Sequence, residues 1–208
     1  DPRQPYWHPS WIEPDPHYRA IRREHTLRSL RLAKELGAPH ITTEPGGPLP
    51  EGGDRQAAYA LFRQELLPCV ELAEELGVGL LIEPEPDLLI ERFGEYLEFA
   101  ETLGSERVGL NFDIGHAFCV AEEPQDWVPR MVEHTVHYHV EDIAASRVHA
   151  HLIPGRGAID LRATLAAIDA TGYEGWLTVE LYPYADEPDL AAAEAFAALV
   201  PMLDDVRS

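Results

Sequence analysis

The stretch TLGSERVGLNFD at residues 102–113 decides the fold class. A helical pattern ends at its glycine, a short apolar run follows, and the run ends in the carboxylate of Asp113. The same pattern returns in ELGAPHITTE (35–44), ELGVGLLIE (75–83), HTVHYHVED (134–142) and TGYEGWLTVE (171–180). The sequence therefore predicts five short strands, each ending at an acidic residue.

Helical periodicity fills the intervals between these strands. We expect helices over residues 17–36, 54–76, 88–103, 125–133 and 160–171. Asp87, Asp126 and Asp160 are candidate caps or first-turn residues, because a carboxylate there accepts hydrogen bonds from free backbone N–H groups. Alternation of short apolar strands with helices indicates a parallel sheet covered by helices.

The strand ends distinguish between two parallel architectures. A doubly wound sheet usually has a glycine-rich phosphate loop at one switch point, and neither GxGxxG nor GxxxxGK[ST] occurs in the chain. In a (β/α)₈ TIM barrel, every strand directs its carboxyl end at one central site. Polar groups at the end of strand after strand therefore favour the α/β TIM barrel.

The chain is short for that fold. It has 208 residues, whereas a complete barrel has about 250, and at most six strands can be counted, with one near Tyr6 to His8. We expect residues 1–208 to form a single domain, a TIM barrel that lacks its first one or two β/α units. The open sheet edge of such a barrel is either covered by a partner or exposed, and a homo-oligomer is one way to cover it.

The composition excludes several classes of partner. Asp and Glu number 37 against 16 Lys and Arg, the formal charge is −21, and Lys34 is the only lysine. Without a basic stripe to neutralise phosphates, nucleic acid is a disfavoured partner. No apolar run reaches the ~18 residues of a membrane helix, and the first residues do not resemble a signal peptide, so we expect no membrane partner and a cytoplasmic location. Cys69 and Cys119 show no metal-type spacing and are expected to be buried thiols.

Acids and histidines gather at the predicted strand ends: Glu83, Asp113, His116, His137, His139, His149, His151 and Glu180. Carboxylates that converge there would repel one another unless a positive charge neutralised them, so the set predicts a divalent-cation site. Oxygen and nitrogen ligands suit Mn²⁺, Co²⁺, Mg²⁺, Fe²⁺ or Zn²⁺ without selecting among them. We expect Glu85 and Glu141 to be solvated. The turn at 155–157, GRG, is interpreted equally well as a phosphate-binding turn or as a plain loop.

These segments together resemble a known family, the xylose-isomerase-like TIM barrels, which include sugar isomerases, ketose 3-epimerases, inosose dehydratases and apurinic endonucleases. The resemblance runs through LLIEPEP (80–86), FDIGH (112–116), HYHVED (137–142), PGRGAID (154–160) and GYEGWLTVEL (172–181). It implies a complete or partial TIM barrel that acts on a small sugar or polyol.

The resemblance also implies roles for individual residues. In the epimerases and isomerases one metal is held by residues that correspond here to Glu83, Asp113, His139 and Glu180. The two glutamates would form the acid/base pair that moves a proton next to a carbonyl, and His116 would contact substrate. The epimerases have an arginine six residues after the metal-binding histidine; that position is Ala145 here, and Arg147, two residues later, is the candidate substrate contact.

A second comparison, with the apurinic endonucleases, adds candidates for substrate binding or a second metal. In SRVHAHLIPGRG (146–157), His151 matches one of their ligands and His149 stands where they have an aspartate. His8 and Glu44 correspond to two more ligand positions, so the resemblance implies a second metal near His8, Glu44 or His116.

The sequence therefore predicts a divalent-metal-dependent sugar or sugar-phosphate isomerase or epimerase, with metal-assisted dehydration as a closely related reaction. The alternatives are a metal-dependent phosphodiesterase similar to the apurinic endonucleases, and a catalytically silent barrel that binds a sugar or a partner protein.

Overall fold

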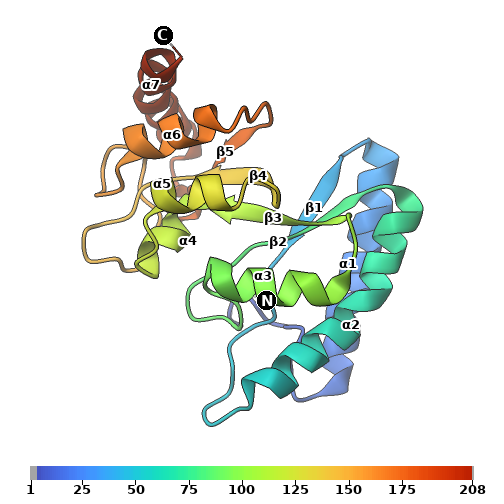
Figure 1. The fold of residues 1–208 in the computed structure, drawn as a ribbon. Helices are drawn as coiled ribbons and strands as arrows, with labels where there is room; N and C mark the ends of the chain where they lie inside the picture. The colour runs from blue at the N-terminus through green and yellow to red at the C-terminus, as the bar shows by residue number, and fades with distance from the viewer. Residues whose placement is uncertain (1–3, 208) are drawn as a thin grey trace. The chain divides into compact units, whose positions relative to one another are not determined.

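The computed structural model describes residues 4–207, whose fold is shown in Figure 1. Five strands form within these residues, in the spatial order β1-β2-β3-β4-β5. They are β1 (His40–Thr43), β2 (Gly79–Ile82), β3 (Val108–Asp113), β4 (Thr135–Val140) and β5 (Leu177–Val179). The pairs β1/β2, β2/β3 and β4/β5 are parallel. The five predicted strands and their parallel arrangement are thereby confirmed.

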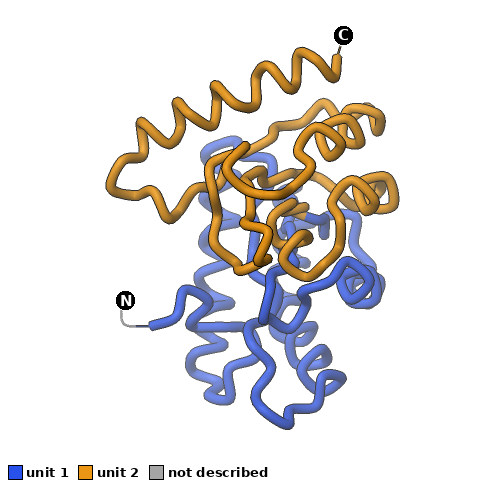
Figure 2. Tube along the Cα trace, turned by 90° about the vertical axis from the view of Figure 1, so that its left-hand side faces the viewer, with its two compact units in different colours: residues 1–110 blue, residues 111–208 orange. Residues whose placement is uncertain are grey.

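The chain divides into two compact units, residues 1–110 and 111–208, and the boundary falls inside β3 (Figure 2). The first unit holds β1, β2 and the beginning of β3, and the second holds the end of β3 with β4 and β5. The single-domain organisation stays a prediction.

Three helices belong to the first unit: α1 (Pro16–Leu36), α2 (Arg55–Leu76) and α3 (Phe93–Leu103). Asp15 and Asp54 cap α1 and α2, because each side chain accepts hydrogen bonds from backbone N–H groups of the first turn. Both helices end at a glycine with positive φ, Gly37 (71°) and Gly77 (68°), a conformation that glycine adopts without steric cost. The helices predicted over residues 17–36 and 54–76 therefore agree with α1 and α2 to within one residue at each end.

The core of the first unit lies between its sheet and its helices. The rings of Phe62 in α2 and Phe99 in α3 stack with centroids 4.5 Å apart, and Trp11 packs on Phe62 at 5.8 Å. In β2, Leu80 and Ile82 have no exposed surface, and Leu81 between them is 1% exposed. A strand buried on both faces is the expected result for a parallel sheet covered by helices.

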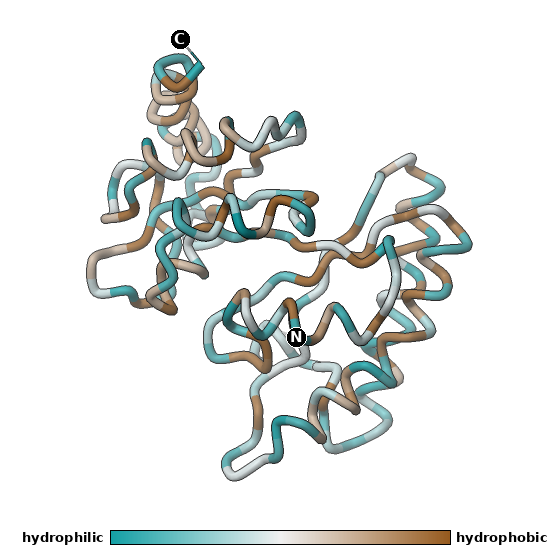
Figure 3. The backbone as a smooth tube through the Cα atoms, in the orientation of Figure 1, coloured by the Kyte–Doolittle hydropathy of each residue, from teal (hydrophilic) through white to brown (hydrophobic). Residues whose placement is uncertain are grey.

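Four helices belong to the second unit: α4 (Ile114–Cys119), α5 (Pro124–Trp127), α6 (Leu161–Ala170) and α7 (Pro188–Val206). Two 3₁₀ turns, η1 (Val128–Arg130) and η2 (Tyr182–Tyr184), accompany them. Figure 3 shows brown and pale turns over most of α7 and teal at its C-terminal end. The apolar turns contribute Ala191 and Ala195, which pack against Ile153 in a small buried cluster.

Two predicted elements are wrong. The chain from Tyr6 to His8 is not a strand: the N–H of His8 donates to the carbonyl of Pro5 at 3.0 Å, which closes a turn. The helix predicted from residue 88 begins only at Phe93, because residues 88–90 form a buried loop in which the N–H of Leu89 donates to the carbonyl of Gly47 at 2.8 Å. A buried apolar loop has the same composition as a helix face, so the pattern alone misplaced this boundary.

The helix predicted over 125–133 is shortened to α5 followed by η1. Pro129 lies inside this stretch and has no backbone N–H, so the α-helical hydrogen bonds cannot continue there and the chain tightens into a 3₁₀ turn.

Within residues 4–207 neither cysteine forms a disulfide; Cys69 is buried as predicted, whereas Cys119 is partly exposed. No helix within residues 4–207 has both the length and the apolar character needed to cross a membrane.

Candidate functional site

Three of the four predicted metal ligands belong to the second unit and lie close together. Asp113 ends β3, His139 lies in β4, and Glu180 follows β5. Nδ1 of His139 is 3.8 Å from Oδ2 of Asp113 and 3.4 Å from Oε2 of Glu180. Because neighbouring parallel strands end at the same edge of a sheet, residues far apart in the chain converge here. The convergence predicted for Asp113, His139 and Glu180 is present.

Asp113 is buried and yet charged. Its Oδ1 accepts a hydrogen bond from the N–H of His116 at 2.7 Å, which caps α4. Burial alone would raise the pKa of Asp113, but the neighbouring His116 and His151 and a hydrogen bond from Glu141 outweigh it and lower the pKa to about 2. A carboxylate held ionised in a buried place is a suitable ligand for a cation.

Glu180 is also favoured as a carboxylate. Burial, the largest influence, and the charge of Asp113 oppose the charged form, but the hydrogen bond from His139 and the charges of His139 and His151 together outweigh them and lower the pKa of Glu180. An ionised Glu180 can either bind a cation or accept a proton.

Glu141 is not solvated, contrary to the prediction, because its side chain has no exposed surface. Glu85 is likewise buried, with 9% exposed. The N–H of Gly115 donates to Oε1 of Glu141 at 2.5 Å. Burial, followed by the charge of Asp113, raises the pKa of Glu141 well above its usual value, so this carboxyl is the protonated donor to Asp113. The signal for Glu141 was available: it lies two residues beyond His139, the spacing at which strand residues share a face.

Three histidines form a second group in this unit. His116 and His151 are buried, and His149 is partly buried. Their ring nitrogens lie within 4.8 Å of one another. Burial lowers the pKa of His149 to about 4, and the adjacent His116 adds to this effect. The imidazole of His149 is therefore neutral near pH 7.

Asp142 organises the GRG turn. Its Oδ2 accepts hydrogen bonds from the N–H groups of Gly155 (2.9 Å) and Gly157 (2.8 Å), and its Oδ1 accepts from Ile143 (3.0 Å) and Ile159 (3.1 Å). An internal carboxylate thus occupies the N–H groups that a phosphate would need. The interpretation of GRG as a structured loop, rather than as a phosphate-binding turn, is favoured.

Arg147 contacts Phe118 and Glu123, two other residues of the second unit. Its guanidinium lies 3.9 Å from the centroid of the Phe118 ring, donates to the carbonyl of Phe118, and pairs with Glu123 at 2.5 Å. These contacts hold the residue at a positive φ of 59°. A role of Arg147 in substrate binding stays a prediction.

In the first unit, Glu44 and Glu83 follow the adjacent strands β1 and β2. The N–H of Glu83 donates to the carbonyl of Thr43 at 3.1 Å, so the hydrogen-bond ladder extends to this residue. Burial raises the pKa of Glu44 and the charge of Glu83 adds to the rise, whereas Arg22 opposes it. The place of Glu83 beside the other three predicted ligands stays a prediction.

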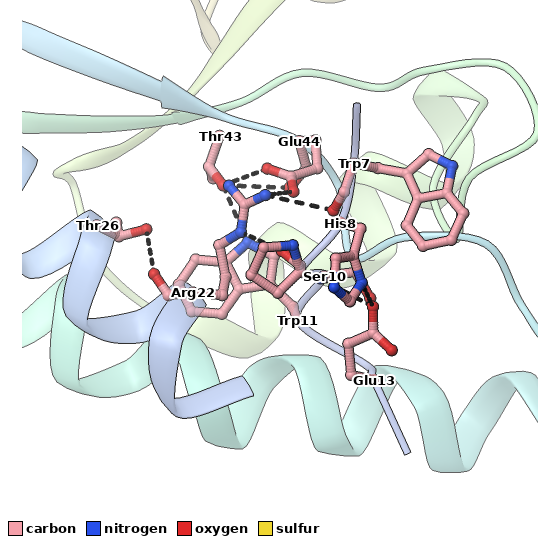
Figure 4. A network of polar contacts seen from close by, with 10 residues as sticks. Trp7, His8, Ser10, Trp11, Glu13, Arg22, Thr26, Thr43 and Glu44 are labelled. Atoms are coloured by element: carbon pink, nitrogen blue, oxygen red, sulfur yellow. Dashed lines mark hydrogen bonds and ion pairs between the residues drawn. The ribbon is translucent and has the colours of Figure 1, made fainter. Parts of the chain in front are cut away.

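Figure 4 shows the network around Glu44. Arg22 of α1 forms an ion pair with Glu44 and donates to the carbonyl of Pro9 at 2.6 Å. His8 is engaged with Glu13, with 2.7 Å between Nδ1 and Oε1. His8 and Glu44 are therefore held by residues of their own unit, and a metal-binding role for either stays a prediction.

Several of these residues fit a metal ion. One group that could hold an ion combines Asp113, Glu141 and His151, and a second combines the three histidines. Carboxylate and imidazole donors suit divalent first-row ions and Mg²⁺, and the donor set of Asp113, His139 and Glu180 is of this kind. The structure therefore supports a metal-binding site, without establishing the metal.

The chain has curated relatives that include a sugar epimerase and a catabolic protein. The chain is 28% identical over 197 residues to fructoselysine 3-epimerase of Escherichia coli O157:H7, which covers 90% of this chain and 70% of that protein. It is 27% identical over 183 residues to the rhizopine catabolism protein MocC of Rhizobium meliloti, which covers 76% of this chain but only 56% of MocC. The chain thus spans only 56% and 70% of the length of these two relatives.

Solved structures show the same fold. A D-tagatose 3-epimerase-like protein superposes with a TM-score of 0.86 at 23% identity, over 98% of this chain and 76% of that one. The IolI protein, solved with a zinc atom, superposes with a TM-score of 0.76 at 21% identity, over 88% of this chain and 69% of that one. Both likenesses show the fold predicted from the strand ends, a partial TIM barrel. The family model described as xylose isomerase-like TIM barrel matches residues 2–202, and the chain belongs to this family.

Proposed function

We propose that the chain is a divalent-metal-dependent isomerase or epimerase of a small sugar or polyol, acting by proton transfer next to a carbonyl. The observation that carries the proposal is the meeting of Asp113, His139 and Glu180 at the ends of β3, β4 and β5. Relatives that include a fructoselysine 3-epimerase and inosose isomerases support the substrate class.

Asp113, His139 and Glu180 would hold the ion, and the family resemblance adds Glu83 as the fourth ligand. Their mixed donors fit Mn²⁺, Co²⁺, Mg²⁺, Fe²⁺ or Zn²⁺, and the zinc atom in the IolI structure shows that the fold accommodates one of these ions. When bound, the ion would supply polarisation of the substrate carbonyl and so make the adjacent C–H more acidic.

The two glutamates would carry the proton. One carboxylate removes the proton from the carbon next to the carbonyl, and the other returns a proton to the opposite face or to the neighbouring carbon. Glu180 suits the first task, because the hydrogen bond from His139 keeps it ionised. The protonated Glu141 then serves to position Asp113, which holds the ion and does not react.

The test combines metal content with isotope exchange. The purified chain is reloaded with Mn²⁺, its metal content is measured, and fructoselysine, inososes and simple ketoses are screened for solvent deuterium incorporated next to the carbonyl. We expect about one or more ions per chain and exchange that Glu180→Gln reduces by more than about 1000-fold, because a group that transfers the proton is lost.

The matched control is Glu174→Gln, which removes an exposed carboxylate from the same unit and should leave exchange unchanged. Glu83→Gln should behave like Glu180→Gln. A Glu180→Gln variant with an unchanged rate would remove the acid/base role, and a chain that takes up no metal would favour a binding module.

A further inference from the structure

The last strand of the second unit has an open edge. β5 pairs with β4, and within residues 4–207 no other strand pairs with β5. The backbone N–H and C=O groups on the outer edge of a strand in this position are a template for pairing with another chain. What can approach β5 therefore depends on the side chains around this edge.

An apolar groove of about 630 Å³ lies between β5 and α7. Apolar side chains from both elements line it: Trp176, Leu177 and Val179 from β5 and the residue before it, and Phe196, Val200 and Leu203 from α7. We call the surface formed by these six residues the β5–α7 face. It joins a strand edge, which offers backbone hydrogen bonds, to a groove that offers apolar contact.

The helix α7 is apolar on two sides. Its buried residues, Ala191, Ala195 and Leu199, form one side. The three helix residues of the β5–α7 face follow one another at i, i+4 and i+7, so they share a second side. Figure 3 agrees, because most turns of α7 are brown or pale. A helix with apolar residues on more than one side is normally buried on more than one side.

Two exposed aromatic rings dominate the β5–α7 face. Trp176 is 83% exposed and Phe196 is 70% exposed. The two side chains together hold roughly 300 Å² of exposed apolar surface. The largest apolar patch on a typical monomer measures about 300–600 Å², and one partner of a standard interface buries about 800 Å². These two rings alone thus supply about a third of the surface that a stable dimer needs.

The charge of the chain favours a second copy at this face. The formal charge is −21, so two copies repel each other wherever their carboxylates meet. Among the described residues that line the groove there is no carboxylate, and Arg207 is the only charged side chain. Two copies can therefore approach through this face without bringing acids together. Each copy also supplies an open strand edge and exposed rings, as a self-complementary contact requires.

We propose that the β5–α7 face is the interface of a homodimer in which two α7 helices pack antiparallel about a two-fold axis. Arg207 follows the end of α7, and Asp189 lies in its first turn. The antiparallel arrangement therefore places Arg207 of one copy beside Asp189 of the second copy. Arg207 lies 3.6 Å from Oδ1 of Asp169 in its own unit and, as a guanidinium, keeps further N–H groups for this contact.

The oligomeric state in solution tests the proposal. Sedimentation equilibrium of the chain is measured at about 1–100 μM, because a dimer forms by mass action. We expect a species of twice the 23.3 kDa of the chain. Phe196→Asp should raise the dissociation constant of the dimer by more than about 100-fold, because an aromatic anchor is lost and a carboxylate enters each side of the interface. Leu32→Asp, which changes an exposed apolar residue of α1, is the matched control and should leave the constant unchanged.

A charge reversal tests the antiparallel arrangement. Asp189→Arg should weaken the dimer by about 5-fold, because two guanidinium groups then face each other. Adding Arg207→Asp to this variant exchanges the two charges and should restore the constant of the parent chain. A double variant that dimerises no better than Asp189→Arg overturns the antiparallel arrangement.

Two results overturn the interface itself. A chain that stays monomeric over the whole concentration range shows that the face is exposed or covered by a different chain. A dimer that Phe196→Asp leaves intact uses another surface. If Phe196→Asp does not fold, as judged by circular dichroism, Phe196→Ala replaces it: we expect a dimer weakened by more than about 10-fold, and an unchanged constant overturns the proposal. None of these variants changes Asp113, His139 or Glu180, so the result is independent of the proposed function.

Discussion

The strand ends of the two units carry similar acids, but the nitrogen-containing side chains that face these acids differ. In the first unit, Glu44 faces the guanidinium of Arg22. In the second, Asp113 faces the imidazoles of His116 and His139 and receives a hydrogen bond from Glu141. A guanidinium stays charged at every pH of interest and completes an ion pair, whereas an imidazole can lose its proton and bind a metal. The side chain that faces each acid, rather than the acid itself, thus determines whether the site is an ion pair or a candidate metal centre.

Removing the guanidinium should give the largest stability effect in this comparison. Arg22→Met leaves the buried carboxylate of Glu44 without its cation and frees the carbonyl of Pro9. We expect the free energy of unfolding to fall by about 2–4 kcal/mol near neutral pH, measured by urea denaturation. Arg28→Met, which breaks an exposed ion pair with Glu24 on the same helix, should cause no measurable change.

The pH dependence sharpens this prediction. The pKa of Glu44 is already raised by burial, and without Arg22 it rises further. A raised pKa in the folded state favours the protonated form, so stability is lost as the pH rises towards that pKa. The deficit of Arg22→Met should therefore be smaller at about pH 5 than at about pH 8; a deficit that is equal at both would show that packing, not charge, is what Arg22 contributes.

A smaller effect is expected where the backbone of α4 approaches Glu141. A Cβ atom on Gly115 would lie 2.1 Å from Oε1 of Glu141, and Oε1 already accepts the N–H of Gly115. Gly115→Ala should lower the free energy of unfolding by about 1–3 kcal/mol and reduce metal uptake by displacing Glu141 and Asp113. Gly94→Ala in α3 meets no atom within 4 Å and should stabilise the chain by up to about 1 kcal/mol. Equal effects of both substitutions would contradict the close approach.

Glu141→Gln should give the smallest effect near pH 5. The amide can donate to Asp113 and accept from Gly115 as the protonated carboxyl does, so we expect a change below about 1 kcal/mol. Because the pKa of Glu141 is raised in the folded state, the parent chain loses stability as the pH rises above the unfolded pKa, by at most about 1.4 kcal/mol per pH unit. The variant lacks this loss, so its stability relative to the parent should increase with pH. A constant difference between about pH 5 and about pH 8 would mean that folding does not raise the pKa of Glu141.

Much of the fold was predictable from local pattern. The glycine stops after α1 and α2, the cap predicted at Asp160 and the apolar runs located five strands and most helices, since these signals act over a few residues. The repeated acids at strand ends indicated the barrel, and Asp113, His139 and Glu180 do meet. The errors lie at residues 6–8, 88–92 and 128–133, where a local turn, a backbone contact with a distant residue, and an internal proline, respectively, replaced the regular element.

Residue order along the chain was sufficient for the fold class and for three of the candidate ligands, because strand periodicity and parallel pairing are local rules. It was not sufficient to predict the charge and the hydrogen bonding of each acidic side chain. Glu141 and Asp142 are adjacent in sequence and both buried, yet one carboxyl receives a single backbone N–H beside Asp113 and the other receives four, one from the adjacent Ile143 and three from the loop at residues 155–159. Apart from Ile143, those partners lie 13 to 26 residues away along the chain, and they set the charge and hydrogen bonding of each carboxyl, which no local pattern encodes.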